Sequence, residues 1–379
     1  MRIELLPALN GDCILVEYTP LHFILIDGGY VDTYQNYLLP KLKDIAAQGG
    51  VVDLIVVTHI DGDHISGIIN LLEEDKLPIE VKNIWYNGYR HVQSIVKVSK
   101  DPETFVHKNI CKESNTECKP ISAKQGCTLS ALIAQKGLAW NEPTNGGVIK
   151  APMTIPFGDA TIHILSPSED DIDNLGDFWR KRLIKDGLLK KEHSEEYWDD
   201  AFEFCLSKDK PGFHFHEQKV SKSYDLEKMK ETPYEADDSV TNGSSTVFVL
   251  ETGEKRMLFL GDAHAETVMK LLIALYGEEN TPIEFDAVKL SHHGSYNNNS
   301  PKLLSMIACD RWLISTNGDK YNHPDMPTLA HIITRNAGCQ LFFNYKLPVG
   351  DELCKAAYHE KHDFKIVSPE DGGGIVLTI

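Results

Sequence analysis

The chain has 379 residues, enough for two or three domains or for one large layered domain with insertions. Its 42% hydrophobic content excludes a largely disordered chain, and its net charge of −18 disfavours extended binding to duplex nucleic acid. We expect a cytoplasmic protein without a membrane partner, because the sequence shows neither an apolar run of about 18 residues nor a signal peptide.

The first 50 residues predict strands followed by a helix. Apolar and β-branched residues alternate in RIELLPAL and CILVEYT, around a turn at Asn10-Gly11-Asp12, and continue in HFILIDGG. A helix is expected over 36–47, because Gly49-Gly50 ends its pattern.

A unit of short apolar run, polar cluster and helical pattern then recurs. The runs are LIVV, RMLFL, DAVKL and RWLIS, and the clusters after them begin at Thr58, Gly261, Ser291 and Asn317. Alternating strands and helices predict a layered α/β fold. Ligand-binding side chains of such folds gather at the carboxyl ends of strands, where all four clusters lie.

Two segments interrupt this pattern and are expected to be insertions in a single domain over 1–379. Residues 97–126 are polar and lysine-rich, whereas residues 168–238 are acidic and aromatic. We expect the second to be a cap or subdomain. It either packs only on the core, or forms a lid or protein-partner surface that restricts the site to small or single-stranded substrates.

The densest cluster of metal-binding side chains is His59-x-Asp61-x-Asp63-His64, directly after LIVV. A divalent cation needs several nitrogen and oxygen donors at about 2.0–2.2 Å, and this short loop offers four. The alternative is a polar loop in which Asp63 caps the next helix. That alternative accounts for neither histidine, so we predict a metal site.

Asp262 and the pair His292-His293 each follow another apolar run. Two cations about 3.5–4 Å apart need a shared anion, and Asp262 is the candidate, with a helix cap as the alternative. Adjacent histidines after a strand are expected to point in opposite directions. We therefore expect at most one direct ligand and favour His292 over His293, with the other ring in a supporting or structural role.

Together these motifs resemble the metallo-β-lactamase superfamily. LIDGG at Asp27 is similar to its N-terminal strand pair, THIDGDH to its first metal motif, LGD to its bridging acid and SHH to its last histidine. The resemblance implies a four-layered αββα sandwich. It also implies two divalent metal ions, held by His59, Asp61, Asp63, His64, Asp262 and His292.

A narrower resemblance is to the hydrolase domain of ComEC-type DNA-uptake proteins. It rests on Asp61 in place of a histidine, on NGSSTVFVLE, on KLSHHGS and on NHP at His323. It implies nuclease or phosphodiesterase chemistry, without the membrane channel of those proteins.

The superfamily usually has a further histidine ligand between the first motif and the bridging acid. His163 in TIHILSP is the candidate on a strand, but in the narrower resemblance the tract that begins at Asn242 takes that place. Carboxylate in place of imidazole makes the site richer in oxygen, so the expected metal is Zn or Mn, with the preference shifted from strict Zn towards Mn or towards Zn bound with relaxed selectivity.

The resemblance implies hydrolysis by metal-activated hydroxide. Asp61 or Asp63 is expected to orient that hydroxide, and His323 to give a proton to the leaving group. The alternative for His323 is a turn residue before proline. Ser295, Asn317 and Asn242 are expected to hold substrate oxygens.

The expected function is a dinuclear metal-dependent hydrolase of phosphodiester bonds in nucleic acid or nucleotides. Hydrolysis of a thioester, lactone or amide is the alternative, because one fold hosts many chemistries. A catalytically inactive regulatory module is a further alternative, although the expected metal donors are all present.

Overall fold

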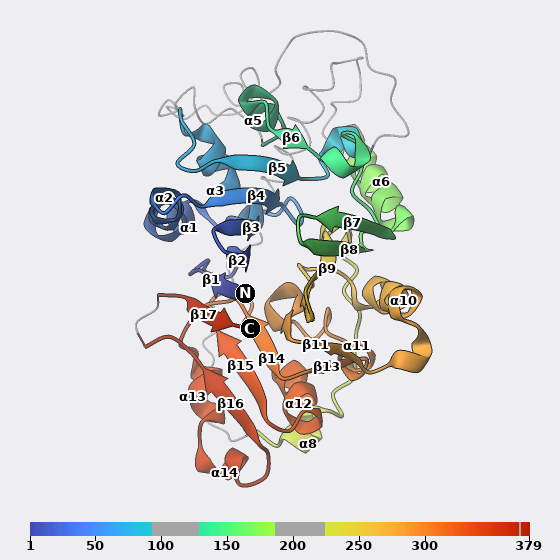
Figure 1. Cartoon of the computed structure of the whole chain (residues 1–379). Coiled ribbons are helices and arrows are strands. Elements are labelled where there is room, and N and C mark those ends of the chain that lie inside the picture. The colour runs from blue at the N-terminus through green and yellow to red at the C-terminus, as the bar shows by residue number, and fades with distance from the viewer. Residues whose placement is uncertain (93–128, 186–223, 371–372) are drawn as a thin grey trace, which may run out of the picture.

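The structure, a computed structural model, describes residues 1–92, 129–185, 224–370 and 373–379 (Figure 1). The expected insertion at 97–126 lies outside these ranges. The expected insertion at 168–238 is described only at its two ends, so its role as a lid or partner surface stays a prediction.

The first sheet has the strand order β17-β1-β2-β3-β4-β5-β6. Strands were expected in this stretch, and β1 to β3 form an antiparallel meander. Strand β17 pairs antiparallel with β1, and β3 to β6 run parallel. The strands are β1 (Arg2–Leu5), β2 (Ile14–Thr19), β3 (His22–Ile26), β4 (Val51–Val56), β5 (Val81–Trp85), β6 (Ala139–Trp140) and β17 (Ile375–Thr378).

The second sheet has the order β16-β15-β14-β12-β10-β9-β8-β7. Its β7 to β10 are antiparallel, and β10, β12, β14, β15 and β16 are parallel. The strands are β7 (Met153–Phe157), β8 (Ala160–Ser166), β9 (Val247–Thr252), β10 (Lys255–Phe259), β12 (Ala287–Lys289), β14 (Arg311–Ile314), β15 (Cys339–Phe343) and β16 (Phe364–Val367). A small separate sheet pairs β11 (Ile283–Phe285) with β13 (Ile307–Cys309).

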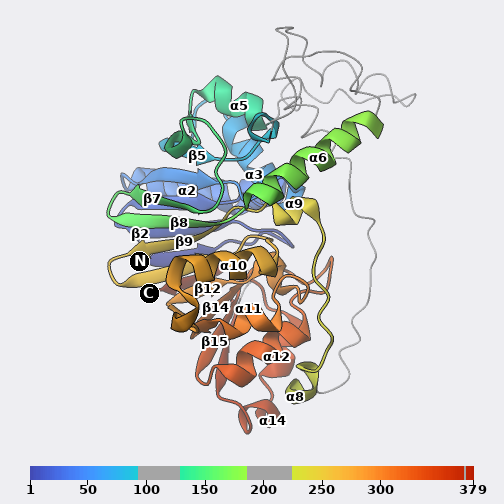
Figure 2. The same cartoon turned by 90° about the vertical axis from the view of Figure 1, so that its right-hand side faces the viewer.

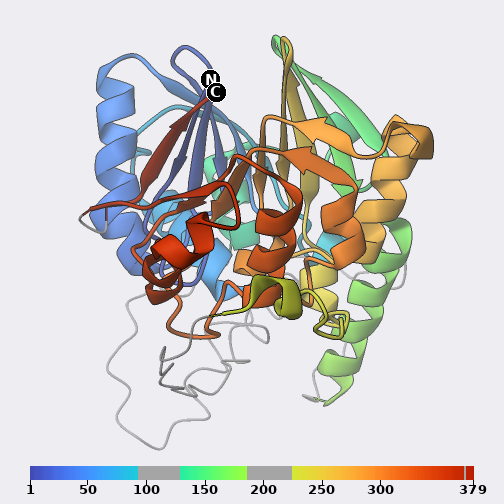
Figure 3. The ribbon, with the colours of Figure 1, turned by 90° about the horizontal axis from the view of Figure 1, so that it is seen from below.

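Helices cover the outer faces of both sheets (Figure 3). The first sheet carries α1 (Val31–Thr33), a π-helical turn (Tyr34–Leu38), α2 (Leu39–Ala47), α3 (Gly62–Glu73) and α5 (Leu129–Lys136). The remaining helices are α6 (Glu169–Lys185), α8 (Leu226–Met229), α9 (Val240–Gly243), α10 (Ala265–Tyr276), α11 (Pro301–Ser305), α12 (Met326–Arg335), α13 (Pro348–Leu353) and α14 (Ala356–His359). Short 3-10 turns lie at Tyr89–His91, Glu142–Thr144, Glu278–Asn280 and Ser291–Gly294.

Two apolar cores hold the layers together, one between the two sheets and one between the first sheet and its helices. Alternate residues of β2, such as Ile14 and Val16, pack with Leu250 of the second sheet, whereas Leu15 between them packs with the helices on the other face. Because side chains of a strand alternate between its faces, both faces of the first sheet are buried. The four-layered αββα sandwich expected from the sequence is confirmed.

Residues 224–238, the C-terminal end of the expected second insertion, run past the parallel half of the second sheet. The segment from α8 to α9 passes α12 and the loop after β12 (Figure 2). The Asp237 amide donates to the Asn297 carbonyl at 3.1 Å, and the Tyr296 hydroxyl donates to the Thr232 carbonyl at 3.0 Å. Within the described ranges, no helix has the length and apolar character needed to span a bilayer.

Candidate metal centre

Four loops meet where parallel strands end. Asp27 follows β3, the motif that begins at His59 follows β4, Asp262 follows β10, and the histidine pair follows β12. Both sheets thus contribute side chains to one site at their shared edge, as expected for ligand-binding groups of an α/β fold.

Glycines let these loops approach closely. A Cβ atom on Gly67 of α3 would lie 1.9 Å from the carbonyl oxygen of Gly28, and one on Gly11 would lie 1.9 Å from that of Asp63. The Gly28 amide donates to the His64 carbonyl at 2.8 Å. Any larger residue would push α3, which carries His64, away from the sheet.

Four imidazole rings surround one carboxylate oxygen. Oδ2 of Asp262 lies 3.5 Å from Nε2 of His64, 3.7 Å from that of His293, 3.8 Å from that of His59 and 3.9 Å from that of His292. Asp262 and all of these histidines except His292 are buried. Residues from three separate loops, up to 234 positions apart, therefore converge on one point.

The Asp27 carboxylate orients the rings of His64 and His59 on the side away from Asp262. Its Oδ2 accepts from Nδ1 of His64 at 2.9 Å and from the Thr58 hydroxyl at 2.7 Å, and its Oδ1 accepts from the Thr58 amide at 2.8 Å. The Thr58 oxygen in turn accepts from Nδ1 of His59 at 3.0 Å. The network assigns the hydrogen of both rings to Nδ1 and leaves the Nε2 lone pairs facing Asp262.

The other two rings are oriented in the same way. Nδ1 of His293 donates to the Ser315 carbonyl at 2.7 Å, and Nδ1 of His292 donates to Oδ1 of Asn298 at 2.9 Å. The Asn298 amide donates to Oδ2 of Asp237 at 2.8 Å, which fixes its orientation. All four rings therefore present an Nε2 lone pair to the same carboxylate.

This arrangement fits a metal ion. Nε2 of His59, His64 and His293 and Oδ1 of Asp262 are buried and have no hydrogen-bond partner among the described residues. Buried acceptors that face one another repel and are costly to leave unpaired. A divalent cation satisfies all of them at once, since neutral imidazole and carboxylate are its usual ligands.

The donors fall into four overlapping groups of three, and within each group the ligand atoms lie within 4.8 Å of one another. Asp12 belongs to two of them, one with Asp27 and His64 and one with Asp262 and His293. The other two are Asp63, His64 and His293 first, and His59, His64 and Asp262 second. Asp61 lies beside the second, with Oδ2 3.8 Å from Nε2 of His59 and 40% of its side chain exposed.

The alternative that Asp63 caps helix α3 is not what the structure shows. The residue at the N-terminal cap is Asp61, and its side chain makes no capping hydrogen bond. The Asp63 carboxylate instead accepts from the Asn10 side-chain amide at 2.6 Å.

The pKa values of His64 and Asp262 reflect the charged side chains that are buried around them. Burial alone would lower the pKa of His64, but the carboxylates of Asp262 and Asp27 raise it well above its ordinary value. Burial alone would raise the pKa of Asp262, but His293, His64 and His292 hold it well below its usual range. Without a cation, a proton on His64 balances the buried Asp262 carboxylate.

The expectation that His292 and His293 point in opposite directions was wrong. Both residues have left-handed backbone conformations, with φ of 44° and 57°, in the turn Ser291–Gly294 rather than on a strand. Strand alternation therefore does not apply, and both rings face Asp262. His293 is the more buried and is grouped with Asp63 and His64, so sequence reasoning underrated it.

His323 lies beside this cluster and Asn242 touches it. The His323 ring centroid is 5.4 Å from that of His292, and its Nδ1 lies 3.2 Å from Oδ1 of Asp325. The Asn242 side-chain nitrogen lies 3.3 Å from Nδ1 of His292 but is bonded to Asp237 at 2.7 Å.

The other candidates lie further out. Ser295 is buried, and its amide donates to the His292 carbonyl at 2.8 Å. Asn317 donates its side-chain amide to Asp319 at 2.8 Å. His163 has both ring nitrogens near other side chains, Thr154 at 3.0 Å and Glu251 at 3.3 Å, and belongs to none of the His/Asp groups found in the described ranges.

A buried ion pair beneath the site escaped sequence reasoning. Lys289 of β12 is buried and bonded to Asp12, and Oδ1 of Asp12 lies 3.6 Å from Nδ1 of His293. The signal was present, because a lysine inside the apolar run DAVKL is unusual. Its partner could not be read from the sequence, since 277 positions separate the two residues.

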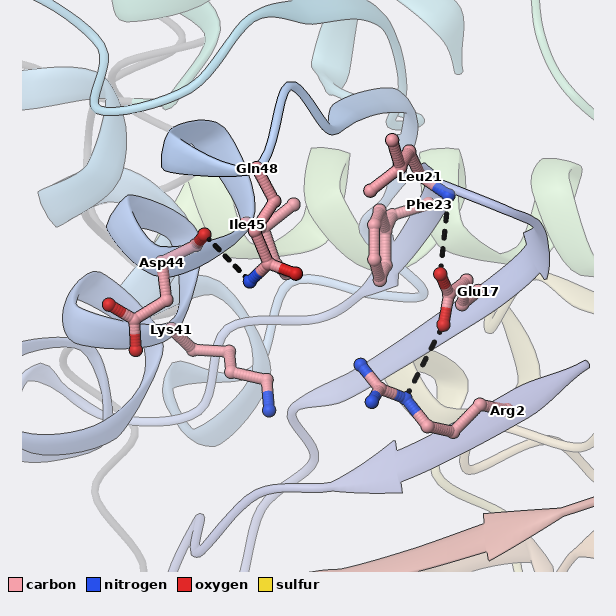
Figure 4. A pocket seen from close by; sticks show the side chains of 8 residues that line it. All are labelled: Arg2, Glu17, Leu21, Phe23, Lys41, Asp44, Ile45 and Gln48. Atoms are coloured by element: carbon pink, nitrogen blue, oxygen red, sulfur yellow. Dashed lines mark hydrogen bonds and ion pairs between the residues drawn. The ribbon is translucent and has the colours of Figure 1, made fainter.

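A separate pocket lies between α2 and strands β1 to β3 (Figure 4). Its cations already have partners: Arg2 lies 3.5 Å from Glu17, and Lys41 lies 2.6 Å from Glu4. None of the histidines described above lines it. The residues that line it are Arg2, Glu17, Leu21, Phe23, Lys41, Asp44, Ile45 and Gln48.

Comparison with known families agrees with the motif at the end of β4. Residues 6–102 match the family model of the metallo-beta-lactamase superfamily. This stretch includes Asp27, His59, Asp61, Asp63 and His64. No curated protein matches the chain. The αββα sandwich is that of the metallo-β-lactamase fold, and this superfamily consists mostly of metal-dependent hydrolases.

Solved structures give distant matches. The metallo-beta-lactamase fold protein YhfI from Bacillus subtilis is 9% identical over 99% of this chain and 98% of its own, with a TM-score of 0.40. Zn-bound PqqB from Methylobacterium extorquens is 10% identical over the whole of both chains, with a TM-score of 0.40. A mutant of CmlA beta-hydroxylase is 11% identical over 99% of this chain and 54% of its own, with a TM-score of 0.36.

Proposed function

We propose that this chain is a metal-dependent hydrolase of phosphodiester bonds in nucleic acid or nucleotides. The observation that carries the proposal is the set of four imidazole lone pairs around Oδ2 of Asp262. Groups that only stabilise a fold are paired with one another, whereas these acceptors face each other, as the ligands of a cation do.

Two divalent cations would use these donors. Asp63, His64 and His293 would hold one, His59 and Asp61 would hold the other with His292 beside them, and Asp262 would serve both. The carboxylate at Asp61 favours Mn or Zn over strict selection of Zn. When bound, divalent cations supply Lewis acidity and a source of hydroxide near neutral pH.

The position of His323 favours a substrate whose leaving group departs through an oxygen atom. Nδ1 of His323 donates to Oδ1 of Asp325, and this contact orients the ring, so that Nε2 would be the atom that gives a proton to the leaving group. An alkoxide leaving group of a phosphodiester needs such a proton, whereas the thiolate of a thioester leaves without one. The motifs KLSHHGS and NHP, which resemble nuclease-like hydrolases, favour the phosphodiester on separate grounds.

The test is an activity panel on protein loaded with Mn or Zn. We expect hydrolysis of bis-p-nitrophenyl phosphate that disappears on chelation and returns with the metal. Asp262→Asn should abolish it. Asp53→Asn, which changes a buried carboxylate of β4 that bonds Tyr18, His22 and Lys82, should not. Turnover of a lactone or a thioester, without turnover of the phosphodiester, would overturn the proposal.

A further inference from the structure

One lysine stands at the rim of the metal centre, on the loop after β14. This loop lies against the turn between β1 and β2: the Asn317 amide donates to the Leu9 carbonyl at 2.8 Å, and the Ser315 hydroxyl donates to the Gly11 carbonyl at 2.8 Å. The same turn carries Asn10, which donates to Asp63. Residues 315–323 are therefore adjacent to one side of the proposed cation positions.

Lys320 is held there by an aromatic ring. Its Nζ lies 4.8 Å from the centroid of Tyr321, within the range of a cation–π interaction. The centroid of Tyr321 is in turn 5.9 Å from that of His323 and 6.4 Å from that of His292. Lys320 and the two histidines thus contact the same tyrosine, which fixes the ammonium group next to the reacting centre.

No carboxylate neutralises this lysine within the described ranges. Lys289, which also lies close to the site, is bonded to Asp12, whereas Lys320 has no carboxylate oxygen within 4.0 Å among the described residues. The neighbouring Asp319 carboxylate is turned to Asn317 instead. Burial would lower the pKa of Lys320, but Tyr321 and Asp63 raise it, so the group is charged at neutral pH.

An unpaired, half-buried ammonium group in a protein of net charge −18 calls for an anion from outside the chain. The cations of the metal centre would take the scissile phosphate. We propose that Lys320 binds a second phosphate group of the substrate, next to the scissile phosphodiester. This inference rests on the proposed function and narrows it to nucleotide chains that carry at least two phosphates. Tyr321 is the positioning residue.

Three matched substrates test the inference: the dinucleotide dTpdT, which has one phosphate, and its 5′-phosphorylated and 3′-phosphorylated forms, which have two. The wild-type protein should cleave at least one phosphorylated form with a kcat/KM about tenfold or more above that for dTpdT, as expected for one charge-assisted hydrogen bond. Lys320→Met should lower kcat/KM for that form about tenfold more than for dTpdT. Lys320→Arg should keep the preference.

Lys43→Met is the matched control, because it removes the same charge from an exposed position of α2. It should leave all three rates unchanged. Metal content and melting temperature are measured for every variant. If Lys320→Met loses metal, Lys320→Gln provides the same comparison.

Two outcomes overturn the inference while the proposed function stands. In one, the wild-type protein cleaves all three substrates with similar kcat/KM. In the other, Lys320→Met lowers kcat/KM by the same factor for all three substrates. Failure of the metal-loaded protein to cleave any of the three, together with turnover of a lactone or thioester, overturns the proposed function and the inference with it.

Discussion

Nδ1 of His64 lies 2.9 Å from Oδ2 of Asp27, and neither side chain is exposed to solvent. Through Thr58 the same carboxylate also orients His59. One buried acid therefore sets the direction of two of the four imidazole rings that face Asp262. The metal centre depends on it although it is not itself a proposed ligand.

Replacement of Asp27 by asparagine should weaken metal binding by about ten- to a hundredfold. The asparagine amide would present a donor to Nδ1–H of His64 or to the Thr58 hydroxyl, where the carboxylate presents an acceptor. The unpaired groups should also lower the free energy of unfolding of the metal-free protein by about 1–3 kcal/mol. Titration with a competing chelator measures the affinity, and denaturant unfolding measures the stability.

Asp53→Asn is the control for Asp27→Asn, because Asp53 is also a buried hydrogen-bonded carboxylate of the first sheet. It should lower stability without changing metal affinity. Equal metal affinity in the two variants would show that Asp27 does not orient the ligands.

The metal-free protein should lose stability as the pH rises above about 6.5, the ordinary pKa of histidine. The pKa of His64 is raised in the folded state, so its contribution is complete below the unfolded value and is lost as the pH rises through the folded value. A cation needs the deprotonated ring, so stabilisation by metal should grow over the same range.

Thermal melts of chelated and metal-loaded protein from about pH 6.5 to about pH 9 measure both effects. His64→Gln should flatten the profile of the chelated protein. A melting temperature of the chelated wild type that rises steadily over this range would contradict the assignment of the proton to His64.

His293→Ala should halve the metal content, from two ions per chain to one. His293 is the buried imidazole grouped with Asp63 and His64, and its Nε2 has no partner among the described residues. Elemental analysis after dialysis measures the content, and circular dichroism checks the fold. Unchanged metal content in His293→Ala would return the role of direct ligand to His292.

His323→Ala should slow hydrolysis of a diester with an alkoxide leaving group far more than hydrolysis of bis-p-nitrophenyl phosphate. The nitrophenolate ion leaves without a proton, so only the poor leaving group needs the histidine. Asp325→Asn should show a weaker form of the same pattern. The ratio of the two rates is the measurement.

His163→Ala is the control for His323→Ala, and it also tests the sequence-based alternative that His163 is a ligand. It should leave both rates and the metal content unchanged, because its ring nitrogens face Thr154 and Glu251. Equal losses on both diesters in His323→Ala would point to a role in binding or folding.

The sequence predicted a layered α/β fold because the alternation of strands and helices is a local pattern. Apolar runs followed by polar clusters located the strand ends at His59 and Asp262. The helix expected over 36–47 is present, and the helical segment begins five residues earlier, at Val31, and passes through a π-helical turn at Tyr34–Leu38. Strand spacing alone places such clusters at one edge of the sheets.

The sequence failed where long-range contacts or unusual backbone conformations decide. The left-handed turn at His292 and His293 has no signature in local propensity. We therefore expected the two side chains to point in opposite directions, as on a strand, and this was wrong. The pairing of Lys289 with Asp12 depends on how the two sheets pack, which no local pattern records.

The central claim is that Asp262 and the histidines around it bind metal ions that hydrolyse a phosphodiester. Stepwise addition of Mn or Zn to chelated protein, with bound metal and turnover of bis-p-nitrophenyl phosphate followed together, tests it most directly. We predict that turnover rises with bound metal and saturates at two ions per chain, and that Asp262→Ala binds fewer ions and is inactive. A chelated protein that retains full turnover, or a fully active Asp262→Ala variant, would contradict the account.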